Sequence, residues 1–282
     1  MRSNGYALAA IALWGTLAAL ALQLRHIPPF FLVGVTLCIG GLVGARRLRL
    51  SALRPSVLLL GLYGLGAYHL CLFLALRLAP PVEANLLNYL WPLFIVVLSP
   101  SLVPGTRLTT RHVAGALSGF AGAALLVTGG RFGFASGFQR SHLTGYLLAF
   151  AAAVIWSTYS LMTRRLGGFP TATISAFCLL AGVVCLGCHA VFEPRYVPTL
   201  AELPWILVVG LGPMGAAFYL WDRALQHGDP RTIGTLAYLT PLLSTLLLTL
   251  VSHHPFARTT AMGMALIVGG AIIGSLPRRA GG

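Results

Sequence analysis

Residues of the segment 81–103 could bind a small solute. Asn85, Asn88 and Pro92 follow one another at i, i+3 and i+7, which places them on one face of a helix. The two amides offer N–H donors and carbonyl acceptors, a combination that suits a carboxyl and an amino group. Pro92 cannot donate a backbone hydrogen bond, so it frees a carbonyl one turn earlier. Tyr89 and Trp91 flank this face, which therefore predicts a site for a partly apolar solute such as an amino acid.

Similar residues stand in the middle of other apolar segments. A polar group is costly at such a depth in a membrane, so each one is a candidate for the solute pathway. For any single aromatic ring, packing against lipid is the alternative interpretation. The candidate substrate-binding residues are Trp14, Tyr63, His69, Asn85, Asn88, Tyr89, Trp91, Trp156, Tyr159, Tyr219 and Tyr238. The candidate helix-bending residues are Gly61, Gly64, Pro92, Gly210, Pro213 and Pro241.

The elements that carry these residues are predicted to be membrane-spanning helices. Of the 282 residues, 57% are hydrophobic and 9% are charged, whereas soluble domains carry about 25% charged residues. Ten spans of ~20 residues would use most of the chain and leave too little for a further folded domain. This excludes a water-soluble enzyme. The predicted spans are 4–24, 28–45, 55–78, 81–103, 111–130, 143–163, 170–192, 203–222, 230–251 and 260–276.

The charge pattern fits a membrane protein rather than a nucleic-acid-binding protein. The net charge is +14, and all 19 basic residues are arginines at the ends of apolar segments rather than on one helix face. Counted on alternate sides of the ten spans, 13 arginines lie on the side of the N-terminus and 6 on the other. The positive-inside rule then predicts that both termini are cytoplasmic, in a bacterial inner membrane. The first span is longer than the apolar region of a signal peptide, so we expect it to be retained.

The two halves of the sequence resemble each other at a constant offset of 149 residues, without a gap in the central block. We therefore expect two five-helix repeats, 1–135 and 140–282, the second inverted because each has an odd number of spans. Inverted repeats are typical of secondary transporters, which bind solute near the membrane midplane between the repeats. The predicted fold is all-α, with ten transmembrane helices around a central cavity. Among the matched pairs are Gly61 with Gly210, Pro81 with Pro230, Tyr89 with Tyr238, and Pro92 with Pro241.

The repeats differ in the polar residues themselves. The first half carries His69, Asn85, Asn88 and Trp91, and the same offset leads to Phe218, Gly234, Ala237 and Thr240. A requirement of the scaffold would be met equally in both halves, whereas an asymmetric ligand needs only one polar wall. This asymmetry favours a substrate site over a purely structural role.

Two paired motifs resemble a known transporter family. Leu-Asn-Tyr-Leu-Trp-Pro-Leu (87–93) and Leu-Ala-Tyr-Leu-Thr-Pro-Leu (236–242) look like the fourth helix of an EamA-type repeat. The glycine patterns of 115–125 and 263–273 are similar to its closing helix. Over essentially its whole length, the chain resembles the drug/metabolite transporter superfamily, and within it the bacterial aromatic amino-acid exporters. The resemblance implies that helices one, three, four, six, eight and nine surround a central cavity.

Other motifs are weaker in this context. The sequence 210–215 spells G-x-G-x-x-G, but a dinucleotide site needs a soluble βαβ unit, so close helix packing is the alternative. Cys185, Cys188 and His189 spell the haem-attachment motif inside an apolar span, where packing of small cysteines is the alternative. His253-His254 lacks further zinc ligands. We expect no cofactor and no metal. Three G-x-x-x-G motifs, beginning at Gly40, Gly115 and Gly270, favour packing within a monomer and leave a dimer open.

The acidic residues do not form a catalytic pair. Asp222 adjoins Arg223 and is expected to be a partnered surface charge, whereas Asp229 sits at a helix start, where a carboxylate is favourable. Glu83 could cap a helix or take part in coupling. The other two acids are predicted to lie in a loop and are Glu193 and Glu202.

The sequence therefore predicts an exporter of small metabolites that works by alternating access and carries amino acids, aromatic ones included. Its partners would be a neutral or zwitterionic solute and the lipid bilayer. Another solute, such as a drug-like compound or a purine, is the alternative within the same fold. A membrane enzyme or a channel is the alternative from another class. Coupling is open, because His69 could carry a proton or act as a neutral hydrogen-bonding group.

Overall fold

The computed structural model describes residues 2–130, 140–166, 169–252 and 258–275, and every regular element within these ranges is a helix. Within the described ranges, six helical segments are long and apolar enough to cross a membrane. The prediction of an all-helical membrane protein is confirmed at this level. These six segments are Pro55–Leu78, Pro81–Leu102, Arg140–Leu166, Thr171–Phe192, Leu203–His227 and Arg258–Ser275.

Proline and glycine residues delimit many of the helices. Proline is well tolerated in the first helical turn, because the N–H that it lacks has no partner there; Pro29, Pro55 and Pro81 occupy such positions. The helices of the first half are α1 (Arg2–Gly15), α2 (Leu17–Leu24), α3 (Pro29–Ala45), α4 (Pro55–Gly61), α5 (Tyr68–Leu78), α6 (Pro81–Asn88), α7 (Trp91–Leu102) and α8 (Thr110–Thr128).

The second half follows the same pattern. Asp229 caps α13 and accepts a hydrogen bond from the backbone N–H of Arg231, as its predicted place at a helix start implies. The segment predicted as 203–222 continues to His227. Gly167-Gly168 and His253-His254 lie outside the described residues. The helices are α9 (Leu143–Leu166), α10 (Ile174–Phe192), α11 (Leu203–Leu211), α12 (Ala217–His227), α13 (Pro230–Ala237), α14 (Leu239–Ser252) and α15 (Arg258–Ser275).

Two π-helical stretches lie where bends were predicted. Leu62–Ala67 joins α4 to α5 and contains Gly64, and Gly212–Ala216 joins α11 to α12 and contains Pro213. A side chain at Gly64 would overlap the ring of Tyr159 on α9, so only glycine allows this approach. Such π-helical irregularities are frequent at functional sites.

The predicted spans 81–103 and 230–251 are each divided into two helices, as 4–24 is divided into α1 and α2. The α-helical hydrogen-bond pattern is interrupted at Tyr89–Leu90, between α6 and α7, and at Tyr238, between α13 and α14, although Leu90 and Tyr238 keep right-handed helical dihedral angles. Pro92 and Pro241 then lie in the first turns of α7 and α14. A proline inside a continuous helix would lose a hydrogen bond and clash with the preceding turn, so a new helix begins instead.

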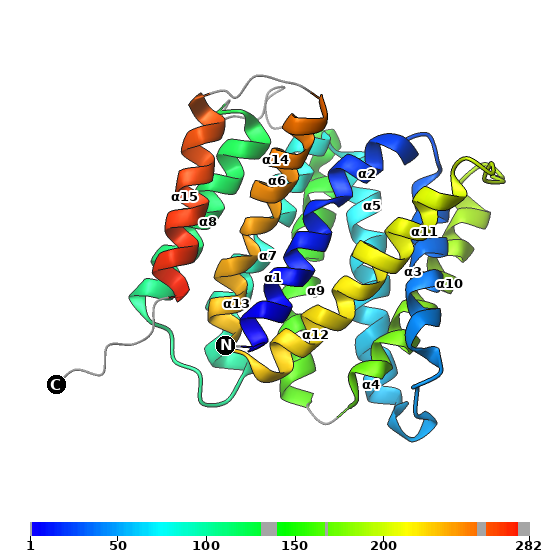
Figure 1. Ribbon diagram of the computed structural model, residues 1–282, viewed down its shortest axis with the longest axis horizontal. Coiled ribbons are helices and arrows are strands. Elements are labelled where there is room, and N and C mark those ends of the chain that lie inside the picture. The colour runs from blue at the N-terminus through cyan, green and yellow to red at the C-terminus, as the bar shows by residue number, and fades with distance from the viewer. Residues whose placement is uncertain (1, 131–139, 167–168, 253–257, 276–282) are drawn as a thin grey trace.

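Glycine-lined helix pairs form the two sides of the bundle. In Figure 1, α8 and α15 lie together on the left and α3 and α10 on the right, with α1, α7, α9 and α12 between them. A Cβ at Gly115 on α8 would lie 2.7 Å from the carbonyl oxygen of Gly270 on α15, and a Cβ at Gly40 on α3 would lie 2.6 Å from the Cα of Gly215. All three G-x-x-x-G motifs are used for packing inside this chain. So is the G-x-G-x-x-G sequence, which lies within the α11–α12 segment.

One end of the bundle collects most of the arginines. The start of α1, the end of α15 and the connections 46–54, 103–109 and 228–229 lie at this Arg-rich end, at the bottom of Figure 1. The connections at the opposite end include 25–28 and 193–202.

Candidate functional site

Five aromatic rings meet in the middle of the bundle. The ring of Trp14 on α1 contacts Trp91 on α7, Trp156 on α9, and both Phe218 and Trp221 on α12, with centroid distances of 5.2–6.4 Å. We call these five residues the aromatic cluster. Most of the pairs meet edge to face, the arrangement that the ring quadrupole favours.

The cluster fills the place where the sequence predicts a central cavity. Trp91, Trp156 and Trp221 are each less than 7% exposed. Two indole N–H groups are bound within the protein: Trp14 Nε1 donates to the Pro213 carbonyl at 3.1 Å, and Trp221 Nε1 donates to Ser160 Oγ at 3.1 Å. In this conformation the rings touch one another.

His69 borders the cluster and is hydrogen-bonded to the backbone of its own helix. Its Nδ1 lies 2.7 Å from the Leu65 carbonyl oxygen, which can only accept, so Nδ1 carries the hydrogen. In the neutral ring, Nε2 is then left as an acceptor. The ring lies 6.2 Å from Phe218, its counterpart at the offset of 149, and 5.0 Å from Tyr68.

Asn88 provides a second acceptor. The residue is 7% exposed, and its Nδ2 points to the hydroxyl of Tyr68 at 3.5 Å. Its Oδ1 is buried without a hydrogen-bond partner among the residues that the structure describes. A buried acceptor without a partner is unfavourable, and ligand binding is one reason for such a group to persist. Tyr68 contacts Trp156 at 5.1 Å, so it links Asn88 and His69 to the aromatic cluster.

Two further candidates lie beside these groups. Tyr159 is 3% exposed and packs between Trp156 at 5.4 Å and Phe177 at 6.4 Å. Asn85 is half-buried one turn before Asn88 on α6. The structure therefore brings Trp14, Trp91, Trp156 and Tyr159 together and places His69 and Asn88 beside them.

Three tyrosines of the predicted set point elsewhere. Tyr63 is 37% exposed, with its hydroxyl 2.8 Å from Thr158 Oγ1. Tyr219 donates to the Gly40 carbonyl on α3 at 3.0 Å. Tyr238 is fully buried against α8 and α15 and donates to the Tyr89 carbonyl at 3.2 Å, so Tyr238 and Tyr89 join the two helix breaks.

Sequence reasoning missed Tyr68 and Trp221 and treated Phe218 as plain apolar wall. Phe218 and Trp221 are three residues apart on α12 and so share a face. This three-residue spacing in the sequence could have indicated that Phe218 and Trp221 face the same site. Tyr68 adjoins His69, and only the packing of α5 on α9 shows that it reaches Trp156.

The prediction for Asp222 was wrong. Asp222 is 2% exposed, and both of its oxygens accept hydrogen bonds from Gln226 Nε2, at 3.0 and 2.9 Å. Arg223 instead lies over the ring of Tyr6, 5.9 Å from its centroid. Neighbouring residues of a helix point about 100° apart, so Arg223 faces outward while Asp222 faces the core.

Glu83 does not cap its helix. The residue before α6 is Pro80, which provides no side-chain cap, and Glu83 is 9% exposed. Its Oε2 has no hydrogen-bond partner within the described part of the chain.

Glu193 and Glu202 lie in the connection between α10 and α11, in a loop as predicted. Glu193 accepts hydrogen bonds from the backbone N–H groups of Phe30 at 2.9 Å and Phe31 at 3.2 Å, at the start of α3. It also lies 2.9 Å from Nδ1 of His189, the histidine of the haem-like motif. Glu202 interacts with His26, and hydrogen bonds from that ring and from the Thr199 backbone lower the pKa of Glu202 to about 2.

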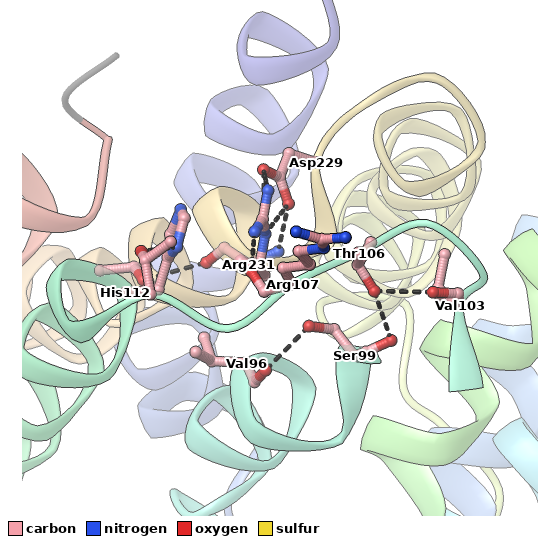
Figure 2. Close-up of polar contacts among 10 residues, drawn as sticks. Val96, Ser99, Val103, Thr106, Arg107, His112, Asp229 and Arg231 are labelled. Atoms are coloured by element: carbon pink, nitrogen blue, oxygen red, sulfur yellow. Dashed lines mark hydrogen bonds and ion pairs between the residues drawn. The ribbon is translucent and has the colours of Figure 1, made fainter. Parts of the chain in front are cut away.

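A polar contact joins the α7–α8 connection to α13 at the Arg-rich end (Figure 2). Arg231 binds Asp229 through Nε at 2.9 Å and Nη2 at 2.6 Å, and its Nη1 donates to the Arg107 carbonyl. Thr106 Oγ1 donates to the Ser99 carbonyl at 2.7 Å, at the end of α7. Burial alone would raise the pKa of Asp229, but hydrogen bonds from Arg231 lower it below its usual value. An open pocket of about 530 Å³ lies beside this contact, between α8 and α13.

Comparisons with known proteins identify the family. The EamA-like transporter family matches residues 1–128 and 143–276. The aromatic amino acid exporter YddG of Ancylobacter novellus is 44% identical over 277 residues, which cover 96% of each chain. The protein of the same name from Escherichia coli is 27% identical and covers 97% of each chain. A crystal structure 43% identical in sequence superposes with a TM-score of 0.93 over 100% of this chain and 99% of the other. These matches confirm the resemblance seen in the sequence, and the chain belongs to the EamA-like transporter family.

Proposed function

We propose that the protein exports amino acids with aromatic side chains across the bacterial inner membrane by alternating access. The observation that carries this proposal is the aromatic cluster with two acceptors beside it, His69 Nε2 and Asn88 Oδ1. The relatives from Ancylobacter novellus and Escherichia coli are named aromatic amino acid exporters, which supports the choice of cargo.

The two parts of the site suit the two parts of such a solute. An aromatic side chain would replace some of the ring contacts within the cluster and keep edge-to-face geometry. The α-ammonium group would donate to His69 Nε2 and Asn88 Oδ1. The described site contains no cation to hold a free anion, so a zwitterion fits better than an organic acid.

The architecture of the proposal is two inverted five-helix repeats, 1–135 and 140–282, that together form ten spans. Two family matches in one chain support it, as do π-helical stretches and proline breaks at corresponding positions in both halves. Counterparts also meet in space: His69 contacts Phe218, and Tyr238 binds the Tyr89 carbonyl. We place the Arg-rich end in the cytoplasm because positive charge is retained on that side, which puts both ends of the chain there.

The proposal is tested with purified protein in liposomes. Vesicles loaded with unlabelled phenylalanine should take up labelled phenylalanine by exchange, whereas empty vesicles without protein should not. Trp156→Ala removes a ring of the cluster, and Trp205→Ala is its matched control because Trp205 is 42% exposed on α11. We expect Trp156→Ala to lose most of the exchange and Trp205→Ala to retain it.

Three results would contradict the proposal or its binding site. Absence of phenylalanine exchange by the unaltered protein would remove the assigned cargo. Preference for a purine or a drug-like cation in competition assays would favour the alternative solute. Equal exchange by Trp156→Ala and Trp205→Ala would move the binding site away from the cluster.

A further inference from the structure

Asp222 is a buried acid that substrate recognition does not use. It lies on α12 directly after Trp221 of the aromatic cluster and is 2% exposed. The sequence carries 19 arginines and only five acids. An acid that merely balanced charge would be expected beside one of these arginines, yet Asp222 faces the core.

The hydrogen-bond partner of Asp222 is a neutral amide. Gln226 Nε2 lies 3.0 and 2.9 Å from its two oxygens and also points to the Phe169 carbonyl at 3.5 Å. Thr171, in the short helix Thr171–Thr173 before α10, offers a hydroxyl. In the described part of the chain, none of the ion pairs involves Asp222.

Arg223 and His227 interact electrostatically with Asp222, but neither forms an ion pair with it in the described part of the chain. On α12 itself, Arg223 turns to Tyr6 of α1, and His227 Nδ1 lies 3.0 Å from the Arg223 carbonyl. From α9, Tyr159 is close enough to interact with it electrostatically, and α10 brings the thiol of Cys178 beside Tyr159. On α13, Arg231 is bound to Asp229 and to the Arg107 carbonyl.

An ionised carboxylate in such a place is unfavourable, because no ion pair among the described residues repays the cost of its desolvation. A proton removes that cost. An amide such as Gln226 can bond to either form of the acid, since it offers both a donor and an acceptor. The acid can therefore hold a proton while buried and release it only when a conformational change brings water to it.

The position of Asp222 connects such a change to the substrate site. Trp221, the preceding residue, packs against Trp14 at 5.2 Å and against Trp91 at 5.6 Å. Tyr159 lies between Trp156 and the side of the bundle that carries Phe177. Separation of the rings would shift α12 and thereby the surroundings of Asp222.

We propose that Asp222 is the proton-binding site through which export is coupled to the proton gradient. Asp222 takes up one proton from the opposite end when the site is open there, and releases it at the Arg-rich end as an amino acid binds. No covalent bond of the amino acid forms or breaks during transport. This inference rests on the proposed function and adds the coupling ion to it.

The experiment compares exchange with gradient-driven transport in the same liposomes. Asp222→Asn keeps the shape and the contact with Gln226 but cannot be ionised. Asp229→Asn is the matched control, because Asp229 lies near the same end and is paired with Arg231. Exchange of labelled phenylalanine is measured without a gradient, and accumulation is measured with vesicles that are acid inside.

We expect the unaltered protein and Asp229→Asn to accumulate phenylalanine several-fold when the interior is acid. Asp222→Asn should exchange phenylalanine within about twofold of the unaltered rate and show no accumulation. Asp222→Glu, which restores an ionisable group, should regain part of the accumulation. A pH dye trapped in the vesicles should report proton movement driven by a phenylalanine gradient, except with Asp222→Asn.

The inference is overturned if the unaltered protein exchanges phenylalanine but ignores the pH gradient. It is also overturned if Asp222→Asn accumulates phenylalanine as the unaltered protein does. Absence of exchange in the unaltered protein would instead contradict the proposed function. If Asp222→Asn fails to fold, the dye measurement on the unaltered protein decides: no phenylalanine-driven proton movement refutes the inference.

Discussion

The break between α6 and α7 and the break between α13 and α14 share a backbone design and differ in their side chains. In each, the α-helical hydrogen-bond pattern is interrupted at a tyrosine, and a proline three residues later lies in the first turn of the next helix. Around the first break stand Asn85, Asn88 and Trp91, and around the second stand Gly234, Ala237 and Thr240. Backbone geometry is thus duplicated, whereas the two amides stand at the first break alone.

This difference separates two requirements of a transporter. Bending and sliding of helices need weak points in both halves, and prolines and glycines provide them. Recognition of an asymmetric solute needs polar groups on one wall and a complementary apolar surface on the other. The contact of His69 with Phe218 places the two walls face to face.

The largest expected effect comes from His69→Phe, which makes the polar wall resemble the apolar one. Loss of an acceptor for a charged ammonium group costs ~1.5–3 kcal/mol of binding, or roughly 10–100-fold in affinity. Half-saturation of phenylalanine exchange in liposomes measures this. Phe73→Leu, beside His69 in α5, serves as the packing control. Unchanged half-saturation in His69→Phe would mean that the two walls are equivalent.

Asn88→Leu should weaken binding and stabilise the folded protein. The amide oxygen has no partner in this structure, so its removal relieves a desolvation cost of ~1–3 kcal/mol while the substrate loses an acceptor. We expect exchange to fall about tenfold or more and the melting temperature in detergent to rise. A fall in both quantities would assign Asn88 to the scaffold.

Tyr238→Phe tests whether the second break is structural. The change removes the hydrogen bond to the Tyr89 carbonyl, so stability should fall by ~0.5–1.5 kcal/mol while the half-saturation for phenylalanine stays the same. Tyr89→Phe is the control, because the accepting carbonyl is unchanged by it. Thermal unfolding and exchange are measured side by side. A weakened affinity in Tyr238→Phe would place this tyrosine in the substrate site after all.

The smallest effect is expected from Thr240→Val at the second break. Thr240 Oγ1 is buried without a hydrogen-bond partner in the described ranges, and valine has nearly the same shape. Stability should stay the same or rise by up to ~1 kcal/mol, with exchange unaltered. A clear loss of exchange would show that the second wall also contributes polar chemistry.

Much of the helical framework follows from local chemistry. Apolar segments bounded by prolines and arginines predicted Pro55–Leu78 at both ends, because a proline start and a charged or extended stop depend on nearby residues alone. The division of 81–103 into α6 and α7 was not predicted. Pro92 predicted a bend in the helix. Whether such a helix kinks or a new helix begins depends on how the neighbouring helices pack against it.

The residue types of the candidate site were predictable from the sequence, but the directions in which their side chains point were less so. Trp14, Trp91 and Trp156 meet as expected, whereas Tyr219 and Tyr238 bind backbone carbonyls away from the cluster. A tyrosine in mid-span has an apolar ring and one polar group, so it serves equally well in packing and in binding. Only the rotation of each helix about its own axis distinguishes the two uses.

By itself, the sequence determined that this is a membrane protein with a repeated helical pattern, polar on one side, because hydropathy, proline positions and the 149-residue offset are properties of the chain. The tertiary structure decided which side chains meet. In it, five rings pack together as the aromatic cluster. Asp222 is buried in the core, whereas its neighbour Arg223 lies over the ring of Tyr6. The physical reason is that burial depends on helix rotation and on contacts between segments far apart in the chain, which no local pattern records.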